Sequence, residues 1–171
     1  MLLSQFRQRL LSLLLIIAIA IIWVLLDATP AFAQESPENY TYSEIRERDF
    51  SHRNLVGGVF AAADARGSNF EGSDVSNSIL TKAIFINTNL KDANFSNSLM
   101  DRVSFENSDL TNAIFQDAVA TSTIFEGATI TGADFTDAIL DRYQIALMCK
   151  RATGTNPTTG VETRYSLGCR D

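Results

Sequence analysis

Residues able to carry chemistry are scarce in this sequence. Its 171 residues include one histidine, two cysteines and one tryptophan. Two cysteines without a neighbouring histidine cannot complete a tetrahedral metal site, and no glycine-rich phosphate-binding motif is present. The carboxylates are scattered, and no spacing forces two of them together as an acid and a base. We therefore interpret His52 as a surface residue, and predict that the protein is not an enzyme and binds neither a metal nor a cofactor.

An excess of positive charge is also missing. Lysine and arginine number 14 against 20 aspartates and glutamates, which gives a net charge of −6. A general nucleic-acid binder needs a basic face that neutralises phosphates, so we expect no nucleic-acid partner. The overall composition is that of a folded globular protein rather than a disordered one.

Proline is absent between Pro37 and Pro157, and this stretch contains an internal repeat. A large apolar residue, or in two cases alanine, recurs at every fifth position. We call these nineteen positions the centres: Phe50, Leu55, Phe60, Ala65, Phe70, Val75, Leu80, Phe85, Leu90, Phe95, Met100, Phe105, Leu110, Phe115, Ala120, Phe125, Ile130, Phe135 and Leu140. A repeat of this regularity must be explained before any local motif.

A period of five fits neither regular element of secondary structure. On a helix, five residues advance by about 140°, and on a strand successive centres would point to opposite faces. The chain must therefore change direction within each five-residue unit if all centres share one core. The residue two before each centre from 58 to 138 is small or valine, and only Arg48 and Arg53 break this rule. The absence of proline suits a backbone whose amides bond to a neighbouring coil.

Two copies show the repeat at its clearest, namely Ala93-Asn94-Phe95-Ser96-Asn97 and Ala133-Asp134-Phe135-Thr136-Asp137. This pattern resembles the pentapeptide-repeat family, and the resemblance covers residues 48–142. It implies an all-β fold, a right-handed quadrilateral β-helix in which four units make one coil of 20 residues. It also implies that the centres and the small positions point inward.

Adding 20 to each residue number groups the outward positions into columns. The residue just before each centre is mostly Asn or Asp in two columns. A third column is apolar at every level: Val59, Ile79, Leu99, Val119 and Ile139. Because an exposed contiguous apolar patch usually marks an interaction site, we predict that this column binds an unidentified protein partner or a second copy of the chain. Two alternatives stay open: the C-terminal tail covers the column, or its branched side chains merely favour extended backbone.

The first 33 residues have the pattern of a targeting segment. Arg7 and Arg9 precede an apolar run from Leu10 to Leu26, and Ala31-Phe32-Ala33 follows. This order is typical of a secretory signal peptide cleaved after Ala33. The alternative is an uncleaved anchor, which would be the chain's only contact with a membrane. Residues 34–47 are predicted to be a linker and an N-terminal cap, with one helical turn begun by a capping box of Thr41 and Glu44.

Residues 143–171 are predicted to form a C-terminal capping helix and a tail. Asp141 and Gln144 suggest a capping box, and an apolar face of Ile145, Met148, Cys149 and Ala152 would cover the open end of the core. Gly154 is the expected stop. In an exported protein Cys149 and Cys169 favour a disulfide that ties the tail to the helix, although a switchable redox pair stays open.

The tail from Gly154 to Cys169 resembles that of thylakoid-lumen pentapeptide-repeat proteins of cyanobacteria and plastids. The resemblance implies a lumenal or periplasmic location, but no established activity. We predict an exported, non-catalytic structural or protein-interaction scaffold. One alternative is a lumenal protein that responds to reduction of the Cys149–Cys169 disulfide. The other is a DNA mimic that inhibits type II topoisomerases, as some family members do; the expected export and the scattered acids count against it.

Overall fold

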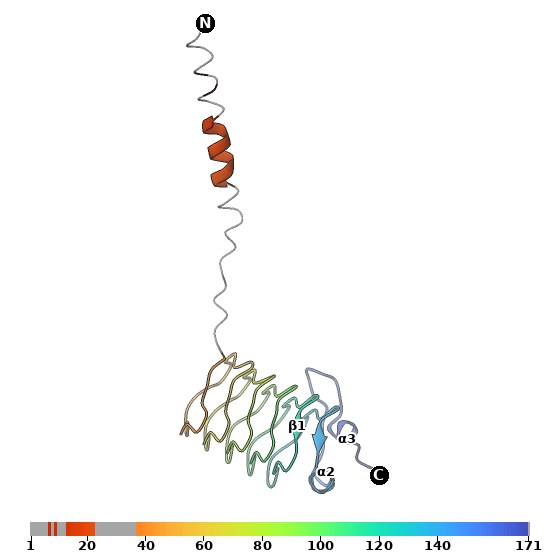
Figure 1. Ribbon diagram of the computed structural model, residues 1–171. Coiled ribbons are helices and arrows are strands. Elements are labelled where there is room, and N and C mark those ends of the chain that lie inside the picture. The colour runs from red at the N-terminus through yellow and green to blue at the C-terminus, as the bar shows by residue number, and fades with distance from the viewer. Residues whose placement is uncertain (1–6, 8, 10–12, 23–36, 171) are drawn as a thin grey trace. The chain divides into compact units, whose positions relative to one another are not determined.

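The computed structural model describes residues 7, 9, 13–22 and 37–170, and the chain divides into two units, Met1–Ser36 and Pro37–Asp171. In the first unit, residues 13–22 are helical (Figure 1). Within the described ranges, no helix combines the length and the apolar character needed to cross a membrane. The predicted cleavage point after Ala33 lies outside the described residues.

The second unit is a stack of coils held together by four ladders of parallel bridges (Figure 1). Every bridge in the repeat joins a residue to the one twenty positions later, as Asn69 joins Asn89 and Ile79 joins Leu99. Only two bridged segments extend to two residues, β1 (Val119–Ala120) and β2 (Ile139–Leu140), which pair in parallel. Strands are this short because the chain turns once in every five residues. The fold is thus a β-helix, as predicted.

Hydrogen bonds between coils explain why the repeat excludes proline. Before the last coil, the amide of each centre donates to a carbonyl of the following coil, as Phe70 does to Asn89 (2.7 Å). The amide just before the centre donates to the preceding coil, as Asn69 does to Arg48 (2.9 Å). A proline at either position would remove a donor from a ladder.

A tight turn closes each five-residue unit. The amide of Ser68 donates back to the carbonyl oxygen of Ala65 (3.1 Å), and the same contact recurs along the repeat. The residue two after each centre has a positive φ in every unit from Tyr42 to Asp137, and most of these residues are Gly, Asn or Asp. These are the residue types that adopt the left-handed region at least cost. The sequence predicted turns beside the centres but not this position.

The centres fill the inside of the coil, which confirms the prediction. All from Phe50 to Phe135 are at most 2% exposed, and Leu140 at the last level is partly buried. Rings of one column stack, as Phe95, Phe115 and Phe135 do with centroids 5.2 and 4.9 Å apart. Rings of adjacent columns meet edge to face, as Phe115 and Phe125 do at 6.0 Å.

The repeat begins earlier than predicted. Residues 41–47 form no helical turn; instead Tyr40 and Ile45 are two further centres, and Asn39 and Glu44 bridge to Val59 and Asp64. Asn39, not Glu44, caps the turn at Thr41, whose amide donates to its Oδ1 (2.9 Å). The boundary at residue 48 and the helical turn predicted to begin at Thr41 were therefore wrong, whereas residues 34–36 of the predicted linker lie outside the described residues. Tyr40 and Ile45 already stand in the register of five, and pairing with the next coil outweighs a local helical preference.

Two short helices follow the last coil, α2 (Arg142–Cys149) and α3 (Thr163–Ser166). The predicted capping box at Asp141 does not form, because its carboxylate accepts from the amide of Ser122 (2.7 Å) in the preceding coil. Helix α2 also ends at Cys149 rather than at Gly154. Met148 and Ala152 are buried as expected, and α3 was not predicted.

Candidate interaction surface and C-terminal clip

One ladder carries the predicted apolar column on its outer side. Bridges join Val59, Ile79, Leu99, Val119 and Ile139 in succession, so the five residues stand directly above one another. Each precedes a centre whose side chain points into the core, and alternation along extended backbone turns its own side chain outward. Ile79, Leu99 and Ile139 are 40%, 49% and 57% exposed. We call these five residues the apolar stripe.

The same position two units along the coil is adapted to water. The Nδ2 of Asn69 donates to Asp49 Oδ1 (3.1 Å), and that of Asn89 donates to Asn69 Oδ1 (2.9 Å). Amide and carboxylate groups thus form a ladder of their own on that face. The stripe has no such polar groups, and the exposure of its side chains shows that the C-terminal tail does not cover it.

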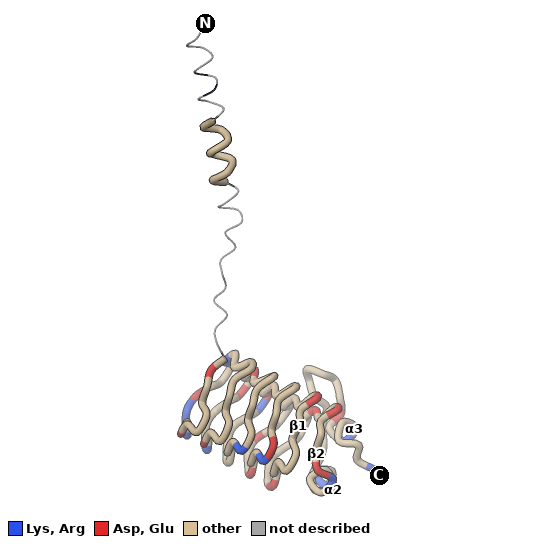
Figure 2. Tube along the Cα trace, in the orientation of Figure 1, with Lys and Arg blue, Asp and Glu red and all other residues tan. Residues whose placement is uncertain are grey.

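The two corners beside the stripe differ in charge. On the side that follows it lie Lys82 and Arg102, both exposed; Arg102 Nη2 pairs with Asp101 Oδ2 at 2.7 Å. On the side that precedes it lie Asn97, Asp117 and Asp137, all exposed. Figure 2 shows that charged residues are otherwise spread over the coils. The stripe therefore runs between a corner where Lys82 and Arg102 lie together with Asp101 and a corner with Asp117 and Asp137.

Another charged cluster lies on a different face. Asp64 is a nearly buried carboxylate that accepts from Arg66 Nε (2.9 Å) and from Arg46 Nε (2.9 Å). The hydrogen bond from Arg66 is the largest cause that lowers the pKa of Asp64, desolvation opposes it, and the bond from Arg46 adds to it. Both arginines are about half exposed, so we assign this cluster to surface structure.

The two arginines that break the small-residue rule lie at the N-terminal end of the coil. The guanidinium of Arg53 stands 5.4 Å from the centroid of the Phe50 ring and pairs with the carboxylate of Glu38. The hydroxyl of Tyr40 donates to the same carboxylate, and its ring meets Phe50 edge to face at 5.4 Å. Arg53 therefore takes part in covering the first layer of the core.

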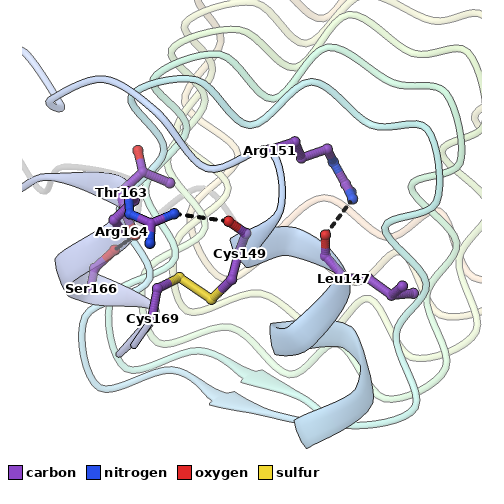
Figure 3. Close-up of a disulfide and its surroundings, with 7 residues drawn as sticks. All are labelled: Leu147, Cys149, Arg151, Thr163, Arg164, Ser166 and Cys169. Atoms are coloured by element: carbon purple, nitrogen blue, oxygen red, sulfur yellow. Dashed lines mark hydrogen bonds between the residues drawn. A yellow bond between two sulfur atoms is a disulfide. The ribbon is translucent and has the colours of Figure 1, made fainter. Parts of the chain in front are cut away.

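A disulfide joins the last residue of α2 to the segment that follows α3 (Figure 3). The sulfur atoms of Cys149 and Cys169 are 1.99 Å apart, and their Cα atoms 5.6 Å. Arg164 Nη1 donates to the carbonyl oxygen of Cys149 (3.0 Å), so the tail meets the end of α2 through a second contact. We call residues 150–170 with this disulfide the C-terminal clip.

Arg151 replaces part of a missing coil. Within the repeat, a hydroxyl at the small position, two residues before a centre, donates to the carbonyl oxygen of a centre residue in the preceding coil, as Ser98 does to Val75 (2.9 Å). No further coil follows the last one. Arg151 donates instead to the carbonyl oxygen of Phe125 and, through Nε, to that of Ala128 (3.1 Å). It also donates to Leu147 at the end of α2 (3.3 Å, Figure 3).

Other side chains accept from the last amides of the coil. Ser166 Oγ accepts from the amide of Phe135 (3.0 Å), and Gln144 Oε1 accepts from the amide of Phe125 (3.3 Å). Asn156 is fully buried and its Nδ2 donates to the carbonyls of Asn112 and Gly132, both at 2.9 Å. Sequence reasoning missed Arg151, Asn156 and Ser166. Each is an ordinary polar residue in a turn-rich tail, and nothing in its spacing links it to a coil.

No catalytic arrangement emerges from the described residues. Within the described part of the chain, no three metal-ligating side chains come together. An open depression of about 330 Å³ beside the tail is lined by Thr155, Glu162 and Arg164, among others, and lacks both histidine and cysteine.

The repeat itself identifies the family. A family model described as pentapeptide repeats matches eight copies within residues 49–81, 59–97 and 98–137, which together make up more than half of the chain. The chain belongs to the pentapeptide-repeat family. No catalytic family is indicated by this match. The family predicted from the sequence is thus confirmed.

Relatives of this pentapeptide-repeat chain include thylakoid lumenal protein TL20.3 of Arabidopsis thaliana, 61% identical over 31 residues. The match covers 18% of this chain and 11% of that protein, so the chain matches only a small part of the relative's length. A pentapeptide repeat protein from the Arabidopsis thaliana thylakoid lumen is 30% identical, over 74% of this chain and 92% of that one, with a TM-score of 0.49. HetL from the cyanobacterium Nostoc is 20% identical, over 56% of this chain and 48% of that one, with a TM-score of 0.47.

Proposed function

We propose that this pentapeptide-repeat protein is a non-catalytic binding module that presents the apolar stripe to a protein partner. The observation that carries the proposal is the apolar residue at five successive levels of one ladder, three of them at least 40% exposed. A contiguous apolar surface on a soluble fold usually marks an interaction site. A DNA mimic would instead need acidic side chains along such a column.

A rigid backbone makes the stripe useful for binding. Each coil is bonded to its neighbours on all four faces, so the spacing of the stripe is fixed before a partner arrives. Preorganisation of this kind lowers the entropy lost on binding. We infer a right-handed coil of quadrilateral section from the four ladders and the family, and a clip locked by the disulfide.

The proposed location is the thylakoid lumen, or a periplasm if the host has no thylakoid. The names of two Arabidopsis relatives place those proteins in the thylakoid lumen. The cysteine pair at bonding distance fits an oxidising compartment outside the cytosol. Signal cleavage after Ala33 is the route we propose; sequencing the N-terminus of the chain isolated from its host tests it.

Affinity capture with matched variants tests the binding role. Leu99→Asn with Val119→Asn replaces two stripe residues by the residue that other columns carry at this position. Ser104→Asn with Thr129→Asn makes the same change at the same position on two other faces. We expect crosslinked partners from native lumen and membranes to be lost with the first pair and kept with the second. Equal capture by both pairs would contradict a binding role for the stripe.

A second candidate role rests on the clip. Cys149 and Cys169 are both only partly buried, so a dithiol reductant can reach their disulfide. Loss of this bond would release the tail from the end of α2. Reduction is then expected to raise the protease sensitivity of residues 150–170. If thiol titration shows full reduction while the cleavage rate stays constant, the redox role is excluded.

A further inference from the structure

We propose that the partner seated on the apolar stripe is a second copy of this chain, with the two rods parallel and related by a two-fold axis along the rod. The inference rests on the proposed binding role of the stripe and names its occupant. Three properties of the stripe and its corners lead to it.

The first property is the spacing of the stripe. It presents one apolar side chain per coil, at intervals of about 4.8 Å over five levels. Same-face residues recur at about 6.6 Å on an extended strand, and neighbours on a helix surface are about 5–6 Å apart. Either partner falls out of step with the stripe within a few levels. A second stripe has the same interval throughout, so the side chains of two copies can interdigitate along the whole rod.

The second property is the difference between the two corners. A two-fold axis along the rod brings the corner after the stripe of one copy against the corner before the stripe of the other. Arg102 then faces Asp117 of the second copy, within one coil spacing of about 4.8 Å along the axis. The antiparallel arrangement brings like corners together and opposes the basic residues to one another. Charge complementarity therefore selects the parallel pair.

The third property is apolar surface at the N-terminal end of the same two corners. Tyr42 lies at the corner after the stripe and is 83% exposed. The other corner carries Gly57, with the Pro37 ring 3.7 Å from where its Cβ would stand, beside the exposed Val56. In the parallel pair, the tyrosine of one copy lies over this apolar corner of the other. A large exposed ring and an apolar corner thus occur at matching levels.

The size of the contact predicts its strength. One face is about 24 Å long over five levels and only about 10 Å wide, since each side of the coil holds about three extended residues. Even with both corners, this buries less than the roughly 1,200–2,000 Å² typical of stable complexes. We therefore expect a weak dimer that forms as the concentration rises.

Sedimentation velocity on the full chain in mild detergent, over a concentration series, tests the dimer. The expected result is a monomer–dimer equilibrium, weakened at least tenfold by Leu99→Asn with Val119→Asn and unchanged by Ser104→Asn with Thr129→Asn. Arg102→Glu is expected to weaken the dimer, and Arg102→Glu with Asp117→Arg to restore it. A monomer at every concentration would overturn the inference.

Crosslinking tests the orientation. With Ile79→Cys and a short bismaleimide, a parallel pair links 79 to 79, whereas an antiparallel pair places 79 opposite 119 and leaves this variant unlinked. Linkage only in a variant carrying both Ile79→Cys and Val119→Cys would overturn the parallel arrangement. If the chain stays monomeric yet captures another protein through the stripe, the occupant is wrong and the binding role stands. If the stripe variants change neither the oligomeric state nor the capture of another protein, the dimer and the binding role are both contradicted.

Discussion

Phe105 shows at the scale of one residue what holds the coil together. Its side chain is fully buried, and its ring stacks on Phe85 and Phe125 with centroids 5.5 Å away on either side. It also meets Phe95 and Phe115 edge to face. Such ring pairs contribute about 0.5–1.5 kcal/mol each beyond area burial.

Truncation of this ring measures that packing. Phe105→Ala leaves a cavity in the middle of the rod, and we expect a loss of about 3–5 kcal/mol in unfolding free energy. Phe105→Leu is the control, since leucine occupies equivalent centres at Leu90 and Leu110, and is expected to cost much less. Chemical denaturation measures both. A loss under about 1 kcal/mol for the alanine variant would contradict burial of the ring.

Asp64 gives a prediction about how stability depends on pH. Its folded pKa is depressed, first by the hydrogen bond from Arg66 and then by that from Arg46. Its contribution to stability is therefore present above the unfolded pKa of about 3.9 and is lost as pH falls towards the folded value. We expect Asp64→Asn to cost most near neutral pH, and the difference from the parent chain to shrink in acid. Urea unfolding at a series of pH values tests this; a difference independent of pH would contradict it.

Residue types predicted the inside of the coil better than its ends. The centres and small positions follow from a strict local period, because every coil presents the same environment to them. Arg48 and Arg53 stood out as exceptions, but their sequence neighbours gave no reason. The reason for Arg53 is its place at the end of the stack, where its guanidinium lies over Phe50.

Among the elements, the clip is the part least visible in the sequence. A helix after Leu140 and the pairing of Cys149 with Cys169 were expected from local pattern and number. The contacts of Arg151 and Asn156 depend on which carbonyls the last coil leaves open, and this is known only once the coils are stacked. The predicted capping box failed for the same reason, since Asp141 found a better donor in Ser122.

Replacement of Arg151 tests the clip as a substitute coil. Arg151→Met keeps much of the side-chain volume but removes the donors to Phe125, Ala128 and Leu147. Carbonyls left without a partner cost about 1–3 kcal/mol, so we expect faster amide exchange in residues 123–140. Arg142→Met, at the exposed start of α2, is the control. Equal exchange in both variants would show that Arg151 does not support the last coil.

The disulfide gives a separate prediction. It closes a loop of 20 residues, which in the chain-entropy model contributes about 3 kcal/mol. Cys149→Ser with Cys169→Ser should lower the unfolding free energy by roughly that amount, while the circular dichroism of the coil is retained. An unchanged denaturation midpoint would mean that the bridge adds no constraint.

At the scale of the whole molecule, the period of five required only that the chain turn within each unit, and the β-helix followed from the resemblance to the pentapeptide-repeat family. The sequence also predicted the stripe, since adding 20 to each residue number places Val59, Ile79, Leu99, Val119 and Ile139 in one column. The two earlier units at Tyr40 and Ile45 were missed because the series was begun at Phe50, the first phenylalanine of the repeat. What a column binds cannot be deduced from a period, because a repeat describes only how a chain contacts itself.

Carbene footprinting tests most directly whether the stripe is a working surface. The tagged full chain is labelled in native membranes and lumen, and again after purification at high dilution. The account predicts that labelling at Ile79, Leu99 and Ile139 falls at least several-fold in the native setting, while the face carrying Asn69 and Asn89 is labelled equally in both. Equal labelling of the stripe in the two settings would show that nothing covers it, and would contradict the proposed role.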